Sequence, residues 1–260
     1  MCWRPRGAVE VNVQYLILFL RSLLFSIYSL TLIGLASLLC LFLLIFPLRY
    51  RHQLIRFFLR LYLSGLKIIC GLDYQVEGLD NVPDHRFGII FSKHQSAWET
   101  FFLPIIFHDP AVIAKRELLW VPFYGWGLAA VDPILINRSD KSTAMQQIIR
   151  KGKKCLQQGR WILVFPEGTR TVFGTAGKYH LGGARLAAAT DALVIPVAHN
   201  AGYFWPRRGF IKKPGTVTVV IGPAIESKGR SPDEIMASAK SWIETTMLRI
   251  GSLVDKPASE

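Results

Sequence analysis

The chain has 260 residues, of which 51% are hydrophobic and 19% are charged. This composition argues against a disordered protein and favours a globular domain with a membrane-embedded element. The net charge of +13 indicates an anionic partner, which can be nucleic acid, a phospholipid surface or a phosphorylated substrate. Residues 1–70 contain eight lysines and arginines but only one acidic residue, so the positive excess is densest in the most apolar part of the chain. That distribution favours a phospholipid membrane as the anionic partner.

An uncharged run of 27 residues occupies positions 22–48. As a helix rising about 1.5 Å per residue, the run exceeds the roughly 30 Å thickness of the hydrocarbon layer, so it can span a bilayer. It is also too long for the apolar part of a cleaved signal peptide. Residues 54–69 mix three basic side chains with large apolar ones, which is typical of an amphipathic helix at the lipid interface. The sequence leaves open whether the segment spans the bilayer or forms a helical pair that enters one leaflet and returns.

Positive charge around the apolar run predicts its orientation. Four arginines follow the run closely, whereas only two lie near the N-terminus. Because cytoplasmic flanks carry the excess of lysine and arginine, we expect the C-terminal part to lie in the cytoplasm. Gly71 and the polar residues after it mark the exit into a separate domain. We therefore expect a membrane-anchoring helical segment at 1–70 and one α/β domain at 71–260.

Short apolar runs of strand length follow Gly71, and segments of helical character separate them. The clearest helices are 140–158, which Ser139 or Asp140 can cap and Gly159 can end, and 232–250, with a capping box and Gly251 at its end. Strands that alternate with helices predict an α/β fold with a mixed, largely parallel sheet flanked by helices. The expected strands are 87–91, 111–114, 134–136, 161–165, 192–198 and 216–221.

Residues with catalytic or binding chemistry follow four of these strands directly. In open α/β sheets, ligands bind at the carboxyl ends of the strands. Independent surface charges would not fall there so regularly, so we expect these side chains to gather at one edge of the sheet. They are Lys93, His94, Lys115, Arg138 and the stretch from Glu167 to Arg170.

His94 and Glu99 are the candidate catalytic pair. Histidine can take a proton near neutral pH, and a carboxylate on the other ring nitrogen fixes its tautomer and stabilises the imidazolium. Helical positions five apart do not share a face, so the pair requires His94 to precede the helix and Glu99 to reach back. The alternative is an exposed histidine beside a glutamate that complements the helix dipole.

The candidate phosphate-binding residues come from three separate loops. In FPEGTR, at 165–170, Glu167 can accept from a hydroxyl, Gly168 lets backbone amides approach a ligand, and Arg170 offers a planar fork that suits phosphate. Arg138 stands beside an expected helix N-terminus, which attracts anions, and Lys115 adds another cation. Each alone could be a solvated surface charge, and FPEGTR could be only a turn, but together they indicate a phosphate cradle.

Four blocks in order resemble the glycerolipid acyltransferase family, specifically bacterial 1-acyl-sn-glycerol-3-phosphate acyltransferases. They are the His94 to Glu99 block, DPILINR at 132–138, FPEGTR at 165–170 and VIPVA at 194–198. The resemblance covers about residues 70–225. FPEGTR downstream of a histidine block is the specific signal, whereas VIPVA alone is weak.

The resemblance implies that His94 is the general base and that Glu99 stands where the family usually has aspartate. The extra methylene moves the carboxylate by about 1.5 Å or requires a compensating rotamer. The resemblance also implies that Arg138 and Arg170 bind phosphate and that Glu167 and Gly168 help to form the acceptor pocket. The full set of expected substrate-binding residues is Lys115, Arg138, Glu167, Gly168, Thr169 and Arg170.

The implied reaction moves a fatty acyl group from acyl-CoA or acyl carrier protein to the sn-2 hydroxyl of lysophosphatidic acid (1-acyl-sn-glycerol 3-phosphate), which yields phosphatidic acid for phospholipid biosynthesis. It places the chain at the bacterial inner membrane, with the catalytic domain facing the cytoplasm. The bilayer, lysophosphatidic acid and the thioester are the expected partners. No metal or organic cofactor is expected, because the histidines show no ligand spacing.

Other functions remain open at this level. The acceptor could be another lysophospholipid or glycerol 3-phosphate. A lipid esterase or thioesterase would use water instead, although the chain has no G-x-S-x-G motif. A non-catalytic membrane protein could bind anionic lipid through the same cations. Nucleic acid is the poorest candidate, because the basic residues cluster near the membrane segment and no nucleic-acid motif is evident.

Overall fold

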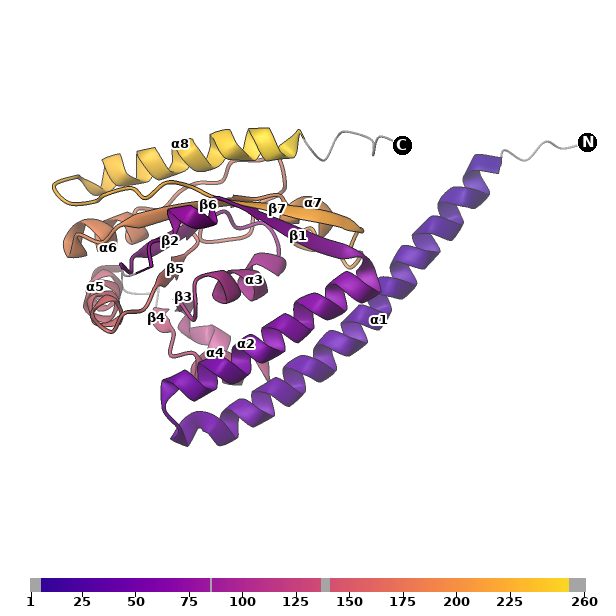
Figure 1. The fold of residues 1–260 in the computed structure, drawn as a ribbon, viewed down its shortest axis with the longest axis horizontal. Coiled ribbons are helices and arrows are strands. Elements are labelled where there is room, and N and C mark those ends of the chain that lie inside the picture. Colours follow the sequence, from indigo (N-terminus) through magenta and orange to yellow (C-terminus); the bar gives the residue numbers. More distant parts are fainter. Residues whose placement is uncertain (1–5, 85, 137–140, 253–260) are drawn as a thin grey trace, which may run out of the picture.

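A helical hairpin at the N-terminus packs against an α/β domain in the computed structural model, which describes residues 6–84, 86–136 and 141–252 (Figure 1). The hairpin consists of α1 (Arg6–Phe42), a 3-10 turn (Leu43–Ile45) and α2 (Leu48–Gly65), which continues into a π-helical turn (Leu66–Cys70). The two helices lie side by side, and the N-terminal end of α1 extends beyond the domain (Figure 1).

The apolar run at 22–48 does not form one continuous helix. It belongs to α1 as far as Phe42, continues through the 3-10 turn, and ends at Leu48, the first residue of α2. Pro47 adopts an extended conformation immediately before α2, and proline both lacks an amide donor and disfavours helix in the residue before it. The chain therefore turns at 43–47 and returns along α1. The structure therefore contains a pair of helices, and its placement in the bilayer stays a prediction.

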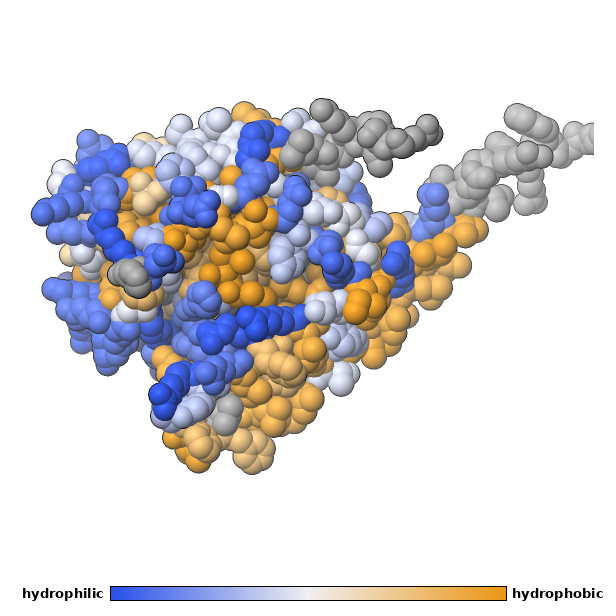
Figure 2. Space-filling model, viewed as in Figure 1, coloured by the Kyte–Doolittle hydropathy of each residue, from blue (hydrophilic) through white to orange (hydrophobic). Residues whose placement is uncertain are grey.

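The outer face of the hairpin is strongly apolar. Among the described residues, one helix is long and apolar enough to cross a bilayer, Val13–Phe42, with a mean hydropathy of 2.1. Most of its large side chains, such as Leu24 and Leu30, are exposed, and they form the continuous hydrophobic surface that runs along the hairpin in Figure 2. An apolar face of this size suits hydrocarbon better than water.

The sheet has seven strands in the order β1-β7-β6-β2-β5-β3-β4. Every neighbouring pair is parallel except β6 and β7, so the predicted mixed, largely parallel sheet is confirmed. The strands are β1 (Leu72–Glu77), β2 (Ile89–Ser92), β3 (Ala111–Lys115), β4 (Ile134–Ile136), β5 (Ile162–Val164), β6 (Val194–His199) and β7 (Gly215–Ile221).

Strand β1 is the one strand that the sequence did not predict. It lies at the edge of the sheet and pairs only with β7 among the described strands. Its middle residues, Tyr74 and Gln75, are exposed, so the strand lacks the continuous apolar run that marks a strand buried on both faces.

Helices cover both faces of the sheet and enclose a separate core on each. On one face, Ile90 of β2 belongs to a cluster with residues of α2 and α3 (Trp98–Ile106). On the other, Ile89 and Phe91 belong to a cluster with residues of α5, α6 and α8. The remaining helical elements are η3 (Leu79–Asn81), η4 (Arg116–Trp120), α4 (Tyr124–Ala130), α5 (Lys141–Gln157), α6 (Gly182–Thr190), α7 (Ala201–Phe204) and α8 (Pro232–Gly251).

The two helices predicted most clearly are present. In α8 the Ser231 hydroxyl accepts from the Glu234 amide, and the Glu234 carboxylate accepts from the Ser231 amide, which completes the capping box. Helix α8 includes Gly251 and ends one residue later than expected. Gly159 follows α5 with a φ of 71°, a left-handed conformation that glycine adopts without strain. The predicted caps of α5, at 139 and 140, lie outside the described residues.

Candidate active site

A cleft of about 680 Å³ lies at the carboxyl edge of the central strands. Strands β2, β5 and β3 are parallel neighbours, so the loops that follow these three strands meet at one edge, as expected. Five of the eight predicted site residues line the cleft. Glu99 and Glu167 do not line it, and Arg138 lies outside the described residues. The five lining residues are His94, Lys115, Gly168, Thr169 and Arg170.

His94 and Glu99 form a hydrogen-bonded pair. His94 lies in the loop between β2 and α3, whereas Glu99 lies in the first turn of α3. The Nδ1 atom of His94 is 2.8 Å from Oε1 of Glu99. The histidine ring is partly exposed to the cleft and stacks on the ring of Phe165, with 4.0 Å between the centroids. This is the arrangement that a histidine–carboxylate dyad requires.

The Glu99 carboxylate is fully buried behind His94. It also accepts hydrogen bonds from the backbone amides of Gln95, at 2.9 Å, and Ser96, at 2.9 and 3.1 Å. Burial tends to raise the pKa of this carboxyl, but the hydrogen bonds from His94 and Ser96 outweigh burial and hold the pKa below its usual value. Glu99 is therefore ionised at neutral pH. It accepts the Nδ1 proton of His94 and leaves Nε2 free to take a proton.

Glu167 is buried beside the loop that contains His94 and does not line the cleft. Its Oε2 accepts from the backbone amide of His94 at 2.9 Å, and its Oε1 accepts from Nζ of Lys93 at 2.7 Å. Thr171 and Gly177 also donate to Oε1, each at 3.2 Å. Since protein donors occupy both oxygens, the expectation that Glu167 accepts from a substrate hydroxyl does not fit this geometry. The carboxylate instead holds the backbone of the loop.

The FPEGTR loop places its glycine and arginine at the cleft. Gly168 has a φ of 66°, which favours glycine, and its amide donates to the Phe165 carbonyl at 2.9 Å. This tight turn brings Thr169 and Arg170 to the cleft wall. Arg170 and the exposed Lys115 then lie on the wall that also carries His94.

Two further cations line the cleft, Arg207 and Arg208. The guanidinium of Arg207 donates to the Arg170 carbonyl at 2.8 Å, so the two loops are in contact. Sequence reasoning missed both residues because they follow a short helix and not a predicted strand. The adjacent arginines in WPRRGF, between proline and glycine, were the available signal.

His199 is a third residue that sequence reasoning missed. It ends β6, is completely buried, and its Nε2 donates to the Lys93 carbonyl at 2.8 Å. Burial lowers the pKa of the imidazole, although Glu99, at 4.0 Å, acts in the opposite direction. The ring is therefore neutral and anchors the peptide that precedes His94. The histidine directly after VIPVA, at the same edge of the sheet as His94, was the available signal.

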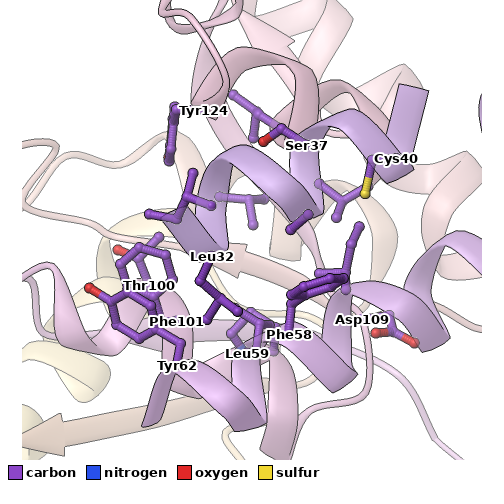
Figure 3. A pocket seen from close by; sticks show the side chains of 18 of the residues that line it. Leu32, Ser37, Cys40, Phe58, Leu59, Tyr62, Thr100, Phe101, Asp109 and Tyr124 are labelled. Atoms are coloured by element: carbon purple, nitrogen blue, oxygen red, sulfur yellow. The ribbon is translucent and has the colours of Figure 1, made fainter. Parts of the chain in front are cut away.

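An apolar cavity of about 160 Å³ adjoins the cleft and lies between the hairpin and the domain (Figure 3). Leu32 of α1, Phe58 and Tyr62 of α2, and Phe101 of α3 surround it (Figure 3). Four residues line both spaces, so the cavity begins where the cleft ends. They are Thr100, Phe101, Val112 and Tyr124.

The residues that the structure describes contain no group of three or more histidine, cysteine, aspartate or glutamate side chains that could hold a metal ion. The chemistry available at the cleft is that of the His94–Glu99 pair and the cations around it. Whether the protein needs a cofactor stays a prediction from the sequence.

Comparisons with known proteins find acyltransferases among the relatives of this chain. The family model described as Acyltransferase matches residues 73–200. A 1-acyl-sn-glycerol-3-phosphate acyltransferase of Pseudomonas aeruginosa is 43% identical over 213 residues, which are 80% of this chain and 82% of that protein. The alpha form of the mouse enzyme (Mus musculus) is 29% identical over 74% of this chain and 68% of its own length.

The fold also matches a solved structure. The 1-acyl-sn-glycerophosphate (LPA) acyltransferase of Thermotoga maritima superposes with a TM-score of 0.75, covering 95% of this chain and 99% of that chain, at 23% identity. At this identity the match shows a common fold, and it includes the region of the N-terminal hairpin.

Proposed function

Because the chain belongs to the family of 1-acyl-sn-glycerol-3-phosphate acyltransferases, we propose that it transfers a fatty acyl group from a thioester to the sn-2 hydroxyl of 1-acyl-sn-glycerol 3-phosphate. The product is phosphatidic acid. The observation that carries this proposal is the His94–Glu99 pair at the wall of a cleft that also contains Arg170.

His94 acts as general base in the proposed reaction. Because Nδ1 is bound to ionised Glu99, Nε2 takes the proton of the acceptor hydroxyl as its oxygen attacks the thioester carbonyl. The tetrahedral intermediate then breaks its carbon–sulfur bond, and the thiolate leaves with the proton from the imidazolium. General-base catalysis contributes roughly 10²- to 10⁴-fold, so positioning of both substrates supplies the rest of the rate enhancement.

The cations of the cleft bind the phosphate of the acceptor. Arg170 offers two parallel N–H donors to phosphate oxygens, whereas Lys115 supplies a point charge. Arg207 and Arg208 extend this positive wall. The phosphate role that the family resemblance gives to Arg138 stays a prediction, because that residue lies outside the described part of the chain.

The apolar cavity behind the cleft holds the acyl chain that is transferred. The thioester carbonyl has to lie beside His94, and the chain attached to that carbonyl can extend past Phe101 into the cavity between the hairpin and the domain (Figure 3). The cavity is lined almost entirely by apolar side chains, which favours hydrocarbon.

The hairpin attaches the enzyme to the membrane that contains its lipid substrate and product. Exposed apolar side chains along α1 support insertion into hydrocarbon, and the arginines that follow the apolar run support a catalytic domain on the cytoplasmic side of the bacterial inner membrane. The donor is acyl-CoA or acyl carrier protein, both of which carry the thioester, and the reaction needs no cofactor.

A panel of acceptors tests the proposal. Purified protein in detergent, supplied with a long-chain acyl-CoA, should form phosphatidate from lysophosphatidate and much less product from lysophosphatidylcholine or glycerol 3-phosphate. Repetition with acyl carrier protein identifies the better donor. Equal rates with lysophosphatidylcholine would contradict recognition of a terminal phosphate, and free fatty acid in place of lipid product would indicate a hydrolase.

A further inference from the structure

Helix α8 contributes a carboxylate that binds Lys93, the residue directly before His94. Glu244 lies 151 residues after Lys93, and its Oε1 accepts from the Lys93 ammonium at 2.8 Å. The hydroxyl of Tyr179 donates to the same oxygen at 2.7 Å. Burial and the adjacent Glu244 both raise the pKa of this phenol above its usual range, so it stays a neutral donor.

Lys93 is held by protein acceptors on all sides. Its side chain is 1% exposed, and Nζ donates to Glu167 at 2.7 Å, to Glu244 at 2.8 Å and to the Thr175 carbonyl at 3.1 Å. A lysine ammonium has three donors, so each has a partner. Lys93 lines a cavity separate from the cleft of His94. Its ammonium is therefore not a substrate ligand.

The same contacts lead to the peptide of the catalytic histidine. Glu167 joins Lys93 through Oε1 and the His94 amide through Oε2, at 2.9 Å. On the other side of this residue, the Thr171 amide donates to the His94 carbonyl at 2.8 Å. Glu244, Lys93, Glu167 and the backbone of His94 thus form one continuous chain of contacts.

We propose that Glu244 and Tyr179 are positioning residues for acyl transfer. They fix the ammonium of Lys93, and through Lys93 and Glu167 they hold the backbone of His94 where its ring meets both Glu99 and the bound acceptor. A misplacement of about 1 Å can cost on the order of 10²-fold in rate, so the effect falls on the chemical step. The inference rests on the proposed function, because it assigns the base to His94.

Glu244→Gln and Tyr179→Phe test this role. Both keep the size of the side chain, and each removes one element of the cluster, a charge or a hydroxyl. We expect kcat to fall by roughly 10- to 100-fold in Glu244→Gln and by less in Tyr179→Phe, with KM for lysophosphatidate unchanged within about twofold. Asp233→Asn is the matched control, since it removes an exposed carboxylate from the same helix and should leave kcat unchanged.

Hydrogen–deuterium exchange distinguishes positioning from general stability. In Glu244→Gln, exchange should rise in the peptide that contains His94, while Tm changes no more than in Asp233→Asn. Unchanged kcat in both variants would overturn the inference, as would a loss of activity that follows only the fraction of unfolded protein. Thiol release measures kcat whether the acyl group goes to lipid or to water. A failure of the proposed function in the native protein is therefore separate from a failure of this inference.

Discussion

The Nδ1 atom of His94 lies 2.8 Å from Oε1 of Glu99, even though glutamate is one methylene longer than the aspartate usual in the family. The longer side chain turns back from the first turn of α3. Its carboxylate then accepts from the amides of Gln95 and Ser96 as well as from the ring. A glutamate at this position therefore reaches the His94 ring and also binds the loop before α3.

Substitution of this carboxylate should reduce the chemical step. In Glu99→Gln the ring loses the charge that fixes its tautomer and stabilises the imidazolium, so we expect kcat to fall by roughly 10²- to 10⁴-fold. KM for lysophosphatidate should change little, because Glu99 does not line the cleft. Steady-state rates of thiol release measure both constants. Glu99→Asp keeps the negative charge but moves it away from the His94 ring, so this variant should retain more activity than Glu99→Gln. A rate for Glu99→Gln within tenfold of the native rate would refute the dyad.

Removal of the Arg170 guanidinium should weaken binding of the acceptor and not the chemical step. Arg170→Ala loses hydrogen bonds to a charged group, which are worth about 1.5–3 kcal/mol, so KM for lysophosphatidate should rise by roughly 10- to 100-fold with a smaller change in kcat. Arg170→Lys keeps the positive charge but loses the paired N–H donors, so its KM for lysophosphatidate should lie between those of the native protein and Arg170→Ala. A decrease in kcat at constant KM would place Arg170 in the chemical step and contradict this role.

A larger side chain in the apolar cavity should alter the choice of acyl chain. Ala36 lines the cavity, whereas its neighbour Leu35 is 51% exposed on the outer face of α1. Ala36→Phe should lower kcat/KM for long-chain thioesters by about tenfold or more relative to short ones, since each lost methylene contact is worth about 1–3 kcal/mol. Leu35→Phe serves as the control. Identical chain-length profiles for the two variants would show that the acyl chain binds elsewhere.

Buried His199 should make the fold less stable at acidic pH. Its folded pKa lies below the usual 6.5, so below pH 6.5 the unfolded chain binds a proton that the folded protein excludes. Stability then falls with decreasing pH by up to about 1.4 kcal/mol per unit until the folded pKa is reached. Thermal unfolding of the native protein and of His199→Gln, between pH 5 and 8, should show a smaller dependence in the variant. Parallel curves would contradict the assignment.

Much of this architecture follows from local sequence. Strands β2 and β6 are buried on both faces and read as continuous apolar runs, and α8 carries its capping box within four residues. Edge strand β1 escaped prediction because its middle residues, Tyr74 and Gln75, are polar or half-polar and exposed, so they break the apolar run. The turn at Pro47 is also local, but an uncharged run of 27 residues did not decide between a single span and the helical pair that the sequence also allowed.

The site was predictable where its residues are close in the sequence. His94 and Glu99 are five residues apart, so their pairing depends only on where α3 begins. The partners of Lys93 come from the loop after β5 and from α8, and no spacing in the sequence indicates that these segments meet. The expected contact between Glu167 and a substrate hydroxyl does not fit the structure for this reason. The Glu167 carboxylate is buried against Lys93 and is not open to substrate.

The most direct test of the account follows two products at once in the native protein and in His94→Ala. Detergent-purified enzyme is given a long-chain acyl-CoA and lysophosphatidate, and free thiol and phosphatidate are measured over time. If His94 is the base for acyl transfer, the two products appear at equal rates and both rates fall by at least about 10²-fold in the variant. Thiol release without phosphatidate, or a variant that keeps the native rate, would contradict it.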